Sequence, residues 1–171
     1  TPMRDYLILT RADRPVGTWL LMWPCWWSVG LATAGTGYAD VVSINLWYLI
    51  LFTLGAFVLR GAGCIVNDLA DRKFDPLVER TAGRPIASGM VSMNLALLFL
   101  TLHGAVGLAI LLQFNTSTIF LGLASIPLIA LYPFAKRVTN WPQVALGITF
   151  NWGALMGWSA IIGGSPQTPT L

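Results

Sequence analysis

The most regular feature of the sequence is the alternation of long apolar stretches with short polar ones. Five stretches contain no Asp, Glu, Lys or Arg: residues 16–35, 41–59, 91–113, 117–135 and 142–162. Each is close to the ~20 residues that an α-helix needs to cross the ~30 Å hydrocarbon layer of a bilayer. The pattern therefore predicts an all-α fold, a polytopic bundle of about five transmembrane helices that forms a single domain over residues 1–171.

Composition and charge placement support a membrane protein with a defined orientation. Only 10% of the residues are charged and 56% are hydrophobic, whereas soluble domains average about 25% charged residues. All ten Lys and Arg residues fall in segments on one predicted side of the bilayer, and the opposite loops, 36–40 and 114–116, contain none. By the positive-inside rule the basic side faces the cytoplasm, or the matrix of a mitochondrion. The net charge of +3 thus reflects topology and is no evidence for a nucleic-acid partner.

An acidic cluster follows the second apolar stretch. If the helix continues beyond residue 59, four oxygen-bearing side chains lie on one face, within an arc of about 100° around the helix axis: Asn67, Asp68, Asp71 and Asp75. Pro76 disfavours helix at Asp75, so we expect the helix to end there. Repelling carboxylates on one face favour a counter-charge, and Mg²⁺ prefers such oxygen ligands. The alternative is a solvated acidic face beside Arg72 and Lys73.

Basic side chains flank this cluster on both sides. Arg60 lies just inside the span, where an ionisable residue is a candidate site residue unless it reaches the interface. Arg80 and Arg84 belong to the polar segment 79–89, which is either a solvated loop or a lid whose guanidinium groups bind phosphate oxygens. Their closeness to the carboxylates favours the lid.

Further candidates lie in the last two apolar stretches and in the first. Tyr132, Lys136 and Arg137 end the fourth stretch on the basic side, and Asn151 is a polar group in the middle of the fifth. Four tryptophans surround Pro24 in the first stretch, at positions 19, 23, 26 and 27. They form either an interfacial aromatic belt or the wall of a cation-stabilising pocket. His103, in mid-span, is expected to hydrogen-bond to a neighbouring helix.

Together these features suggest a substrate with an anionic head and an apolar tail, such as an isoprenyl diphosphate bound with Mg²⁺. Three segments carry a closer likeness: residues 7–27, residues 60–89 with NDLADRKFD at 67–75 and RTAGRP at 80–85, and residues 132–158 with YPFAKR and PQVALG. In these segments the chain resembles the UbiA superfamily of intramembrane aromatic prenyltransferases, especially the ubiquinone-pathway members that prenylate 4-hydroxybenzoate.

The resemblance implies Mg²⁺-dependent transfer of a polyprenyl group from polyprenyl diphosphate to the ring of 4-hydroxybenzoate, ortho to the hydroxyl. It makes Asn67, Asp68, Asp71 and Asp75 the first metal–diphosphate motif. It makes Arg80 and Arg84 candidates for the diphosphate. Tyr132, Lys136 and Arg137 match another family segment, in which Lys136 or Arg137 is expected to bind the substrate carboxylate. Arg60 and Asn151 are further substrate-binding candidates.

The family has about nine helices and a second Asp-rich motif, whereas this sequence has no acidic residue after Glu79. We therefore expect a fragment that is inactive alone, from an enzyme of the bacterial inner membrane or, alternatively, the mitochondrial inner membrane. Two other functions remain open: a sibling prenyltransferase with another aromatic acceptor, and a non-catalytic membrane protein or divalent-cation transporter. The sequence does not indicate the prenyl chain length or the oligomeric state.

Overall fold

The computed structural model describes residues 2–36, 42–138 and 141–163, with the side chains of residues 4–35, 45–131, 141 and 143–163. These residues form helices, turns and irregular segments, without a β-strand among them. The five long helices are α2 (Val16–Thr36), α3 (Val42–Asp71), α5 (Met93–Leu111), α6 (Thr116–Val138) and α7 (Pro142–Ile162). They coincide with the five apolar stretches, so the all-α prediction is confirmed. Three short helices accompany them: α1 (Pro2–Leu9), the 3₁₀-helix η1 (Asp75–Leu77) and α4 (Glu79–Ala82).

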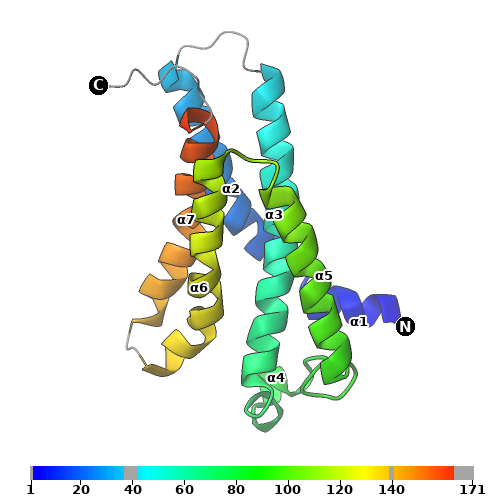
Figure 1. The fold of residues 1–171 in the computed structure, drawn as a ribbon. Helices are drawn as coiled ribbons and strands as arrows, with labels where there is room; N and C mark the ends of the chain where they lie inside the picture. The colour runs from blue at the N-terminus through cyan, green and yellow to red at the C-terminus, as the bar shows by residue number, and fades with distance from the viewer. Residues whose placement is uncertain (1, 37–41, 139–140, 164–171) are drawn as a thin grey trace.

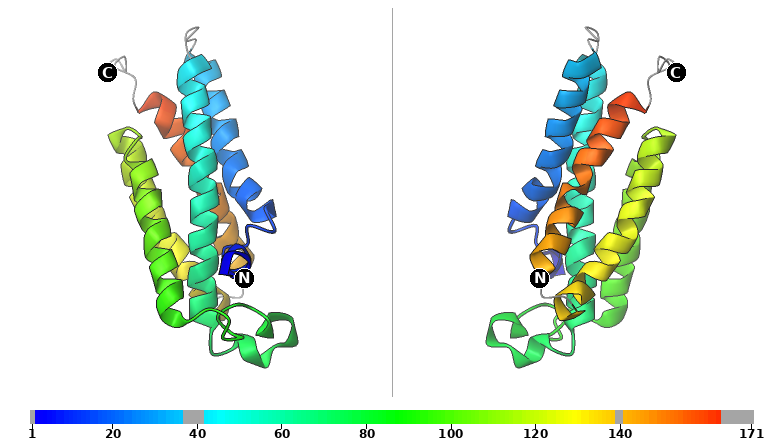
Figure 2. Two further views of the ribbon diagram at one scale, coloured as in Figure 1. Left: turned by 90° about the vertical axis from the view of Figure 1, so that its right-hand side faces the viewer. Right: turned by 90° about the vertical axis from the view of Figure 1, so that its left-hand side faces the viewer.

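The long helices lie side by side, and α1 projects from the lower part of α3 (Figure 1). Helix α2 packs most extensively against α7 and also against α3, while α3 packs against α5 and α6 against α7. Both views in Figure 2 place η1 and α4 beyond the last turn of α3, at the end of the bundle where α6 finishes and α7 begins. The polar and basic segments are therefore gathered at one end.

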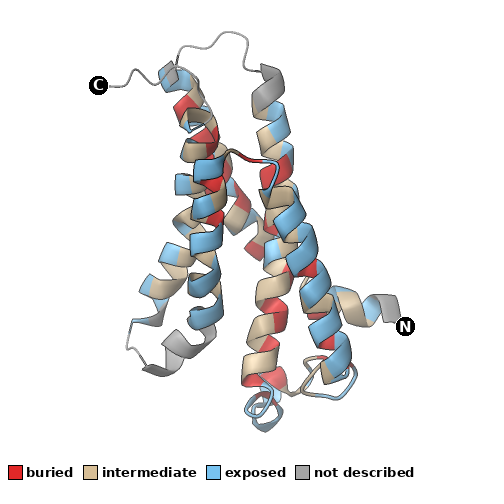
Figure 3. Cartoon of the chain, in the orientation of Figure 1, coloured by how far each residue is buried: buried red, intermediate tan, exposed pale blue. Residues whose placement is uncertain are grey.

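The outer surface of the bundle is apolar. Three helical segments are long and apolar enough to cross a membrane by length and composition, namely Asn45–Asp71, Met93–Leu111 and Gln143–Ile162, and the apolar segment Thr116–Leu131 is shorter. Buried residues face the interior, whereas much of the outward surface of α5 and α6 is exposed (Figure 3). Because exposed leucines such as Leu98 and Leu102 would be unfavourable in water, these faces are suited to lipid.

Glycines allow α2 and α7 to approach closely. A Cβ at Gly157 would lie only 2.5 Å from the backbone oxygen of Cys25 and 3.0 Å from Cβ of Ser28, and one at Gly153 would meet the Cys25 sulfur. The hydroxyl of Ser28 donates to the carbonyl oxygen of Ala154 across the same interface. Small residues and an interhelical hydrogen bond are the usual means of helix association in membranes.

Asn115 joins the start of α6 to the C-terminal end of α7. Its Oδ1 accepts a hydrogen bond from the backbone N–H of Thr118 at 3.0 Å and thereby caps the first turn of α6. Its Nδ2 donates to the carbonyl oxygens of Ser159 at 2.9 Å and Ala160 at 3.0 Å. One side chain thus satisfies backbone groups at two helix ends.

The tryptophans of α2 divide into two groups. Trp19, Trp23 and Trp27 are 54%, 41% and 64% exposed on the outside of the described bundle. Trp26 instead donates from Nε1 to Thr53 Oγ1 of α3 at 3.2 Å. It therefore joins the two helices.

His103 of α5 is buried and joins that helix to α1. Its Nδ1 donates to the carbonyl oxygen of Phe99 at 2.8 Å, and Nε2 lies 3.4 Å from the Tyr6 hydroxyl. Gly61 of α3 makes room for the ring, because a Cβ there would lie 2.7 Å from Nε2. The expectation that His103 hydrogen-bonds to a neighbouring helix is confirmed.

Candidate functional site

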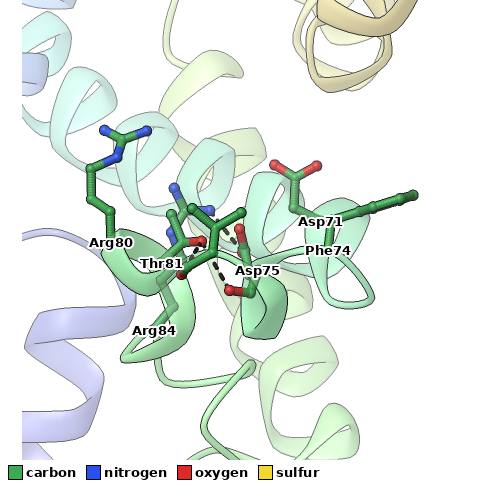
Figure 4. Close-up of a pocket in the computed structure, with 7 residues that line it drawn as sticks. Asp71, Phe74, Asp75, Arg80, Thr81 and Arg84 are labelled. Atoms are coloured by element: carbon green, nitrogen blue, oxygen red, sulfur yellow. Dashed lines mark hydrogen bonds and ion pairs between the residues drawn. The ribbon is translucent and has the colours of Figure 1, made fainter.

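A pocket of about 440 Å³ lies where α3 gives way to η1 and α4. Its walls are Asp71 from α3, Asp75 from η1, Arg80 and Thr81 from α4, and the flanking residues Phe74, Val78 and Arg84. Figure 4 shows Asp71 and Arg80 on opposite sides of Thr81 and Asp75. The structure thus brings two predicted carboxylates and both predicted arginines into one pocket.

The acidic residues do not share one helix, in contrast to the prediction. Helix α3 continues without a break from the apolar span to Asp71, as expected, but it ends there rather than at Asp75. The N–H of Phe74 bonds to the carbonyl oxygen of Asp71 at 2.8 Å in a tight turn, and η1 then begins at Asp75 with Pro76 in its first turn. Pro76 restricts only the backbone of Asp75, whereas the helix already ends four residues earlier, at the turn of residues 72–74.

Asp75 is fixed by contacts with the segment that follows it. Its side chain is only 8% exposed, and Oδ2 pairs with Arg84 Nη1 at 2.8 Å. The Thr81 hydroxyl donates to the backbone oxygen of Asp75 at 3.0 Å, which holds α4 against η1. The segment after α3 is therefore anchored at Asp75, Thr81 and Arg84, while the residues between Asp75 and Thr81 are exposed.

Asp68 lies outside the pocket lining, although it was expected beside the other acids. Its side chain is fully buried, and Oδ1 pairs with Arg11 Nη2 at 2.9 Å and with Arg84 Nη1 at 3.3 Å. The other oxygen, Oδ2, is buried without a hydrogen-bond partner among the described residues. Removing one partner of such a buried pair typically costs about 3–5 kcal/mol, because it leaves an uncompensated charge.

The donor set of the pocket fits a hard divalent cation that also binds a phosphorylated substrate. Over the described residues, no group of three or more His, Cys, Asp or Glu side chains could hold a metal ion by itself. Mg²⁺ however is usually held by one or two carboxylates together with substrate phosphates. Asp71 and Asp75 offer the carboxylates, and Arg80 and Arg84 lie on the same pocket to bind the phosphates.

Arg60 lies apart from this pocket, on the part of α3 inside the bundle. Its Nε is buried and has no hydrogen-bond partner in the described structure. Gly17, near the start of α2, borders the guanidinium so closely that a Cβ there would overlap Nε and would lie 2.8 Å from Nη2. A buried, unpaired guanidinium nitrogen of this kind favours an anionic partner.

Two of the remaining predicted residues, Asn151 and Asn67, do not line the pocket. Asn151 is exposed on α7 and donates to the carbonyl oxygen of Gly147 in its own helix at 2.9 Å. Asn67 is half-buried on α3 and does not line the pocket. The backbones of Tyr132, Lys136 and Arg137 belong to α6, but their side chains lie outside the described residues.

Arg11 is the residue that the sequence analysis did not single out. It binds Asp68, 57 positions away, from the turn between α1 and α2. Two sequence features include it: the arginines before the first apolar stretch and the family-like segment 7–27. The first was interpreted as a topology signal and the second as a general likeness, and neither distinguishes one arginine from another.

Comparisons with known proteins place this geometry in context. The model of the UbiA prenyltransferase family matches residues 21–171. Similar proteins include mitochondrial 4-hydroxybenzoate polyprenyltransferase of Rattus norvegicus, 51% identical over 163 residues, and that of Homo sapiens, 48% identical over 163 residues. Each alignment covers 95% of this chain and 42% of the relative, so the chain spans less than half the length of these relatives.

A solved structure is also similar to the chain. The apo structure of a UbiA homolog from Aeropyrum pernix K1 matches with a TM-score of 0.73 at 27% sequence identity. The match covers 85% of this chain and 50% of that one. The helical arrangement described above is therefore shared with a solved UbiA homolog.

Proposed function

The chain belongs to the UbiA prenyltransferase family, and from this we propose that it is part of a Mg²⁺-dependent enzyme that transfers a polyprenyl group to 4-hydroxybenzoate. The donor is polyprenyl diphosphate, and the product is a precursor of ubiquinone prenylated ortho to the hydroxyl. The observation that carries the proposal is the pocket in which Asp71 and Asp75 lie beside Arg80 and Arg84. Relatives about 50% identical are named for this acceptor, which supports 4-hydroxybenzoate over another aromatic compound.

We assign the diphosphate to this pocket. Asp71 and Asp75, which line the pocket, would hold Mg²⁺. When bound, the ion would neutralise charge on the diphosphate as it leaves. The guanidinium groups of Arg80 and Arg84 supply charge-assisted hydrogen bonds to the phosphate oxygens. In the reaction the bond from the prenyl C1 to the diphosphate oxygen breaks, a bond to the ring carbon forms, and the ring proton is lost.

We assign the carboxylate of the acceptor to Arg60, with Lys136 and Arg137 as the alternatives from α6. The support is the buried, unpaired Nε of Arg60, which a carboxylate would satisfy. At 1.5 Å per residue, Arg60 lies about 16 Å before Asp71 along α3. That distance leaves room for the acceptor ring and the first prenyl carbon between the two groups.

The proposal also covers the cell compartment and the chain itself. We place the enzyme in the inner membrane of a bacterium or a mitochondrion, with the basic connections on the cytoplasmic or matrix side; the mitochondrial names of several relatives support the second compartment.

We further expect the 171-residue chain to be inactive alone, because its carboxylate cluster is only the first of the family's two. Prenyl transfer by the purified chain would contradict that expectation.

The test uses membranes that express the gene to its natural stop codon. Prenyl transfer from polyprenyl diphosphate is measured with 4-hydroxybenzoate, homogentisate and a naphthoate side by side, with and without Mg²⁺. We expect product from 4-hydroxybenzoate that requires Mg²⁺. Asp71→Ala should lower the rate at least about 100-fold, because the lost contact removes several kcal/mol of charge stabilisation.

Asp13→Ala is the matched control, because Asp13 is 44% exposed in a surface pair with Arg14. It should leave the rate within about twofold, since such pairs contribute little. A well-expressed protein that prenylates none of the three acceptors would refute the proposed activity. Preference for homogentisate or the naphthoate would refute the acceptor assignment alone.

A further inference from the structure

The segment between α1 and α2 holds Arg11 in a backbone conformation that favours glycine. Its φ is +57°, and it is the one non-glycine residue with positive φ among those that the structure describes. The N–H of Ala12 bonds to the carbonyl oxygen of Leu7 at 3.0 Å, and that of Arg11 to Ile8 at 3.2 Å. These two bonds form a Schellman motif at the end of α1, and Arg11 occupies its left-handed position, where glycine is preferred. An arginine there calls for an explanation from its side chain.

That side chain begins a relay of alternating charges that ends in the pocket. Arg11 Nη2 binds Asp68 Oδ1 at 2.9 Å, Asp68 Oδ1 also binds Arg84 Nη1 at 3.3 Å, and Arg84 Nη1 binds Asp75 Oδ2 at 2.8 Å. We call these four residues the ionic relay. Asp68 is fully buried, and Arg11 and Arg84 are only 20% and 23% exposed. The relay is therefore largely protected from screening by solvent.

The members of the ionic relay differ in where they lie. Arg84 and Asp75 line the pocket, whereas Arg11 and Asp68 do not. One Arg84 nitrogen, Nη1, is shared by the carboxylates of Asp68 and Asp75. Within the described residues the guanidinium makes no other hydrogen bond than the one from Nη1 to Asp75. Its Nη2 and Nε thus remain for a ligand. Held by Asp75 alone, the guanidinium would be free to turn about a single contact.

We propose that Arg11 and Asp68 are positioning residues that orient Arg84 for the diphosphate, an inference that rests on the proposed function. Asp68 supplies a second, ionic contact to the same Nη1 that binds Asp75, and so restricts where the Arg84 guanidinium can lie. Arg11 compensates the charge of buried Asp68 and holds Oδ1 in place. Asp68, expected as a metal ligand, thereby acts through Arg84. The arrangement parallels the outer-shell hydrogen bonds that orient ligands in metal sites, whose loss weakens binding about 10- to 100-fold.

The experiment measures the binding of inorganic pyrophosphate to the full-length protein in detergent, by calorimetry in the presence of Mg²⁺. Arg11→Met should weaken binding by about tenfold. The same change made in an Arg84→Met background should have little further effect, because residues that act through one another are not additive. Arg14→Met is the control, since Arg14 is 83% exposed in its surface pair, and should bind like the wild type.

Two further variants separate orientation of Arg84 from mere stability of the fold. Arg11→Gly relieves the left-handed backbone but removes the side chain, so it should fold at least as well as Arg11→Met and bind pyrophosphate as weakly. Arg11→Lys keeps the charge without the planar guanidinium and should recover part of the affinity. If Arg11→Met does not fold, Arg11→Lys takes its place in the double-mutant comparison with Arg84→Met.

Each outcome decides between distinct conclusions. Additive losses from Arg11 and Arg84, or wild-type affinity in Arg11→Met, would overturn the positioning inference while leaving the proposed function intact. Wild-type affinity in Arg11→Gly would likewise overturn it, because the Arg11 side chain would then not be needed for pyrophosphate binding. A wild-type protein that binds no pyrophosphate with Mg²⁺ would overturn the proposed function together with the inference.

Discussion

Substitution of Gly157 by alanine tests whether the close approach of α2 and α7 is required for the fold. The added Cβ would lie 2.5 Å from the backbone oxygen of Cys25, and ordinary contact begins near 3.4 Å. Because the obstacle is backbone rather than a flexible side chain, the two helices must separate by about 0.9 Å at this point. A change of that size in a well-packed interface typically costs about 1–3 kcal/mol.

Separation of the helices also affects the hydrogen bond that crosses the interface. The Ser28 hydroxyl donates to the Ala154 carbonyl oxygen only because the glycines bring the helices together. Interhelical bonds of this type contribute about 0.6 kcal/mol on average and up to about 1.7 kcal/mol. We therefore expect Gly157→Ala to lower the free energy of unfolding by about 2–4 kcal/mol relative to a glycine-to-alanine change on the same helix that makes no contact and gains the same helix propensity.

The assay is denaturant unfolding in mixed micelles, followed by circular dichroism, with Gly147→Ala as the matched control. Gly147 lies on the same helix, and a Cβ there would meet nothing within 4 Å. Alanine should leave that variant unchanged or stabilise it by up to about 1 kcal/mol, through its higher helix propensity. Equal stability of the two variants would refute the reasoning, because only the contact with α2 distinguishes them.

Two further substitutions use the glycines of α2 and α3 in the same way. Gly61→Ala should displace the buried ring of His103 and destabilise the protein by about 1–3 kcal/mol. Gly63→Ala is the control and should not destabilise it, because a Cβ there meets nothing within 4 Å. Equal thermal unfolding midpoints for the two variants would contradict this prediction. Gly17→Ala should push the Arg60 guanidinium aside and raise KM for 4-hydroxybenzoate by about tenfold with KM for the diphosphate unchanged, measured against Gly63→Ala. A parallel rise in both KM values would argue against Arg60 as the carboxylate site.

The helices were predictable because an uncharged stretch of span length has few alternatives in a membrane. Backbone groups in lipid must be paired internally, so helix is favoured wherever such a stretch occurs. The continuation of α3 to Asp71 also followed from helical spacing, and it places Asp71 at the pocket. The predicted end of the helix at Asp75 was wrong, since the turn at residues 72–74 depends on local packing.

The contacts between distant segments were not predictable from the sequence. Spacing placed Asp68 on one helical face with Asp71, but Asp68 is buried and bound by Arg11, which belongs to another element. The left-handed backbone of Arg11 has no signal in residue type, because glycine is the usual indicator. Asn151 illustrates another limit: a polar residue in mid-span was expected to need a partner or a ligand, and spacing alone did not indicate that its amide bonds to the backbone of its own helix.

The contact between Arg11 and Asp68 has a consequence for biogenesis. The two residues are 57 positions apart, and between them the chain forms all of α2 and most of α3. A ribosome-bound chain therefore cannot complete the ionic relay until α2 and α3 have both been synthesised and α3 has returned to the end of the bundle where α2 began. Correct placement of these two helices is thus a precondition for assembling the ionic relay, and a chain in which either was misplaced would leave Asp68 without Arg11.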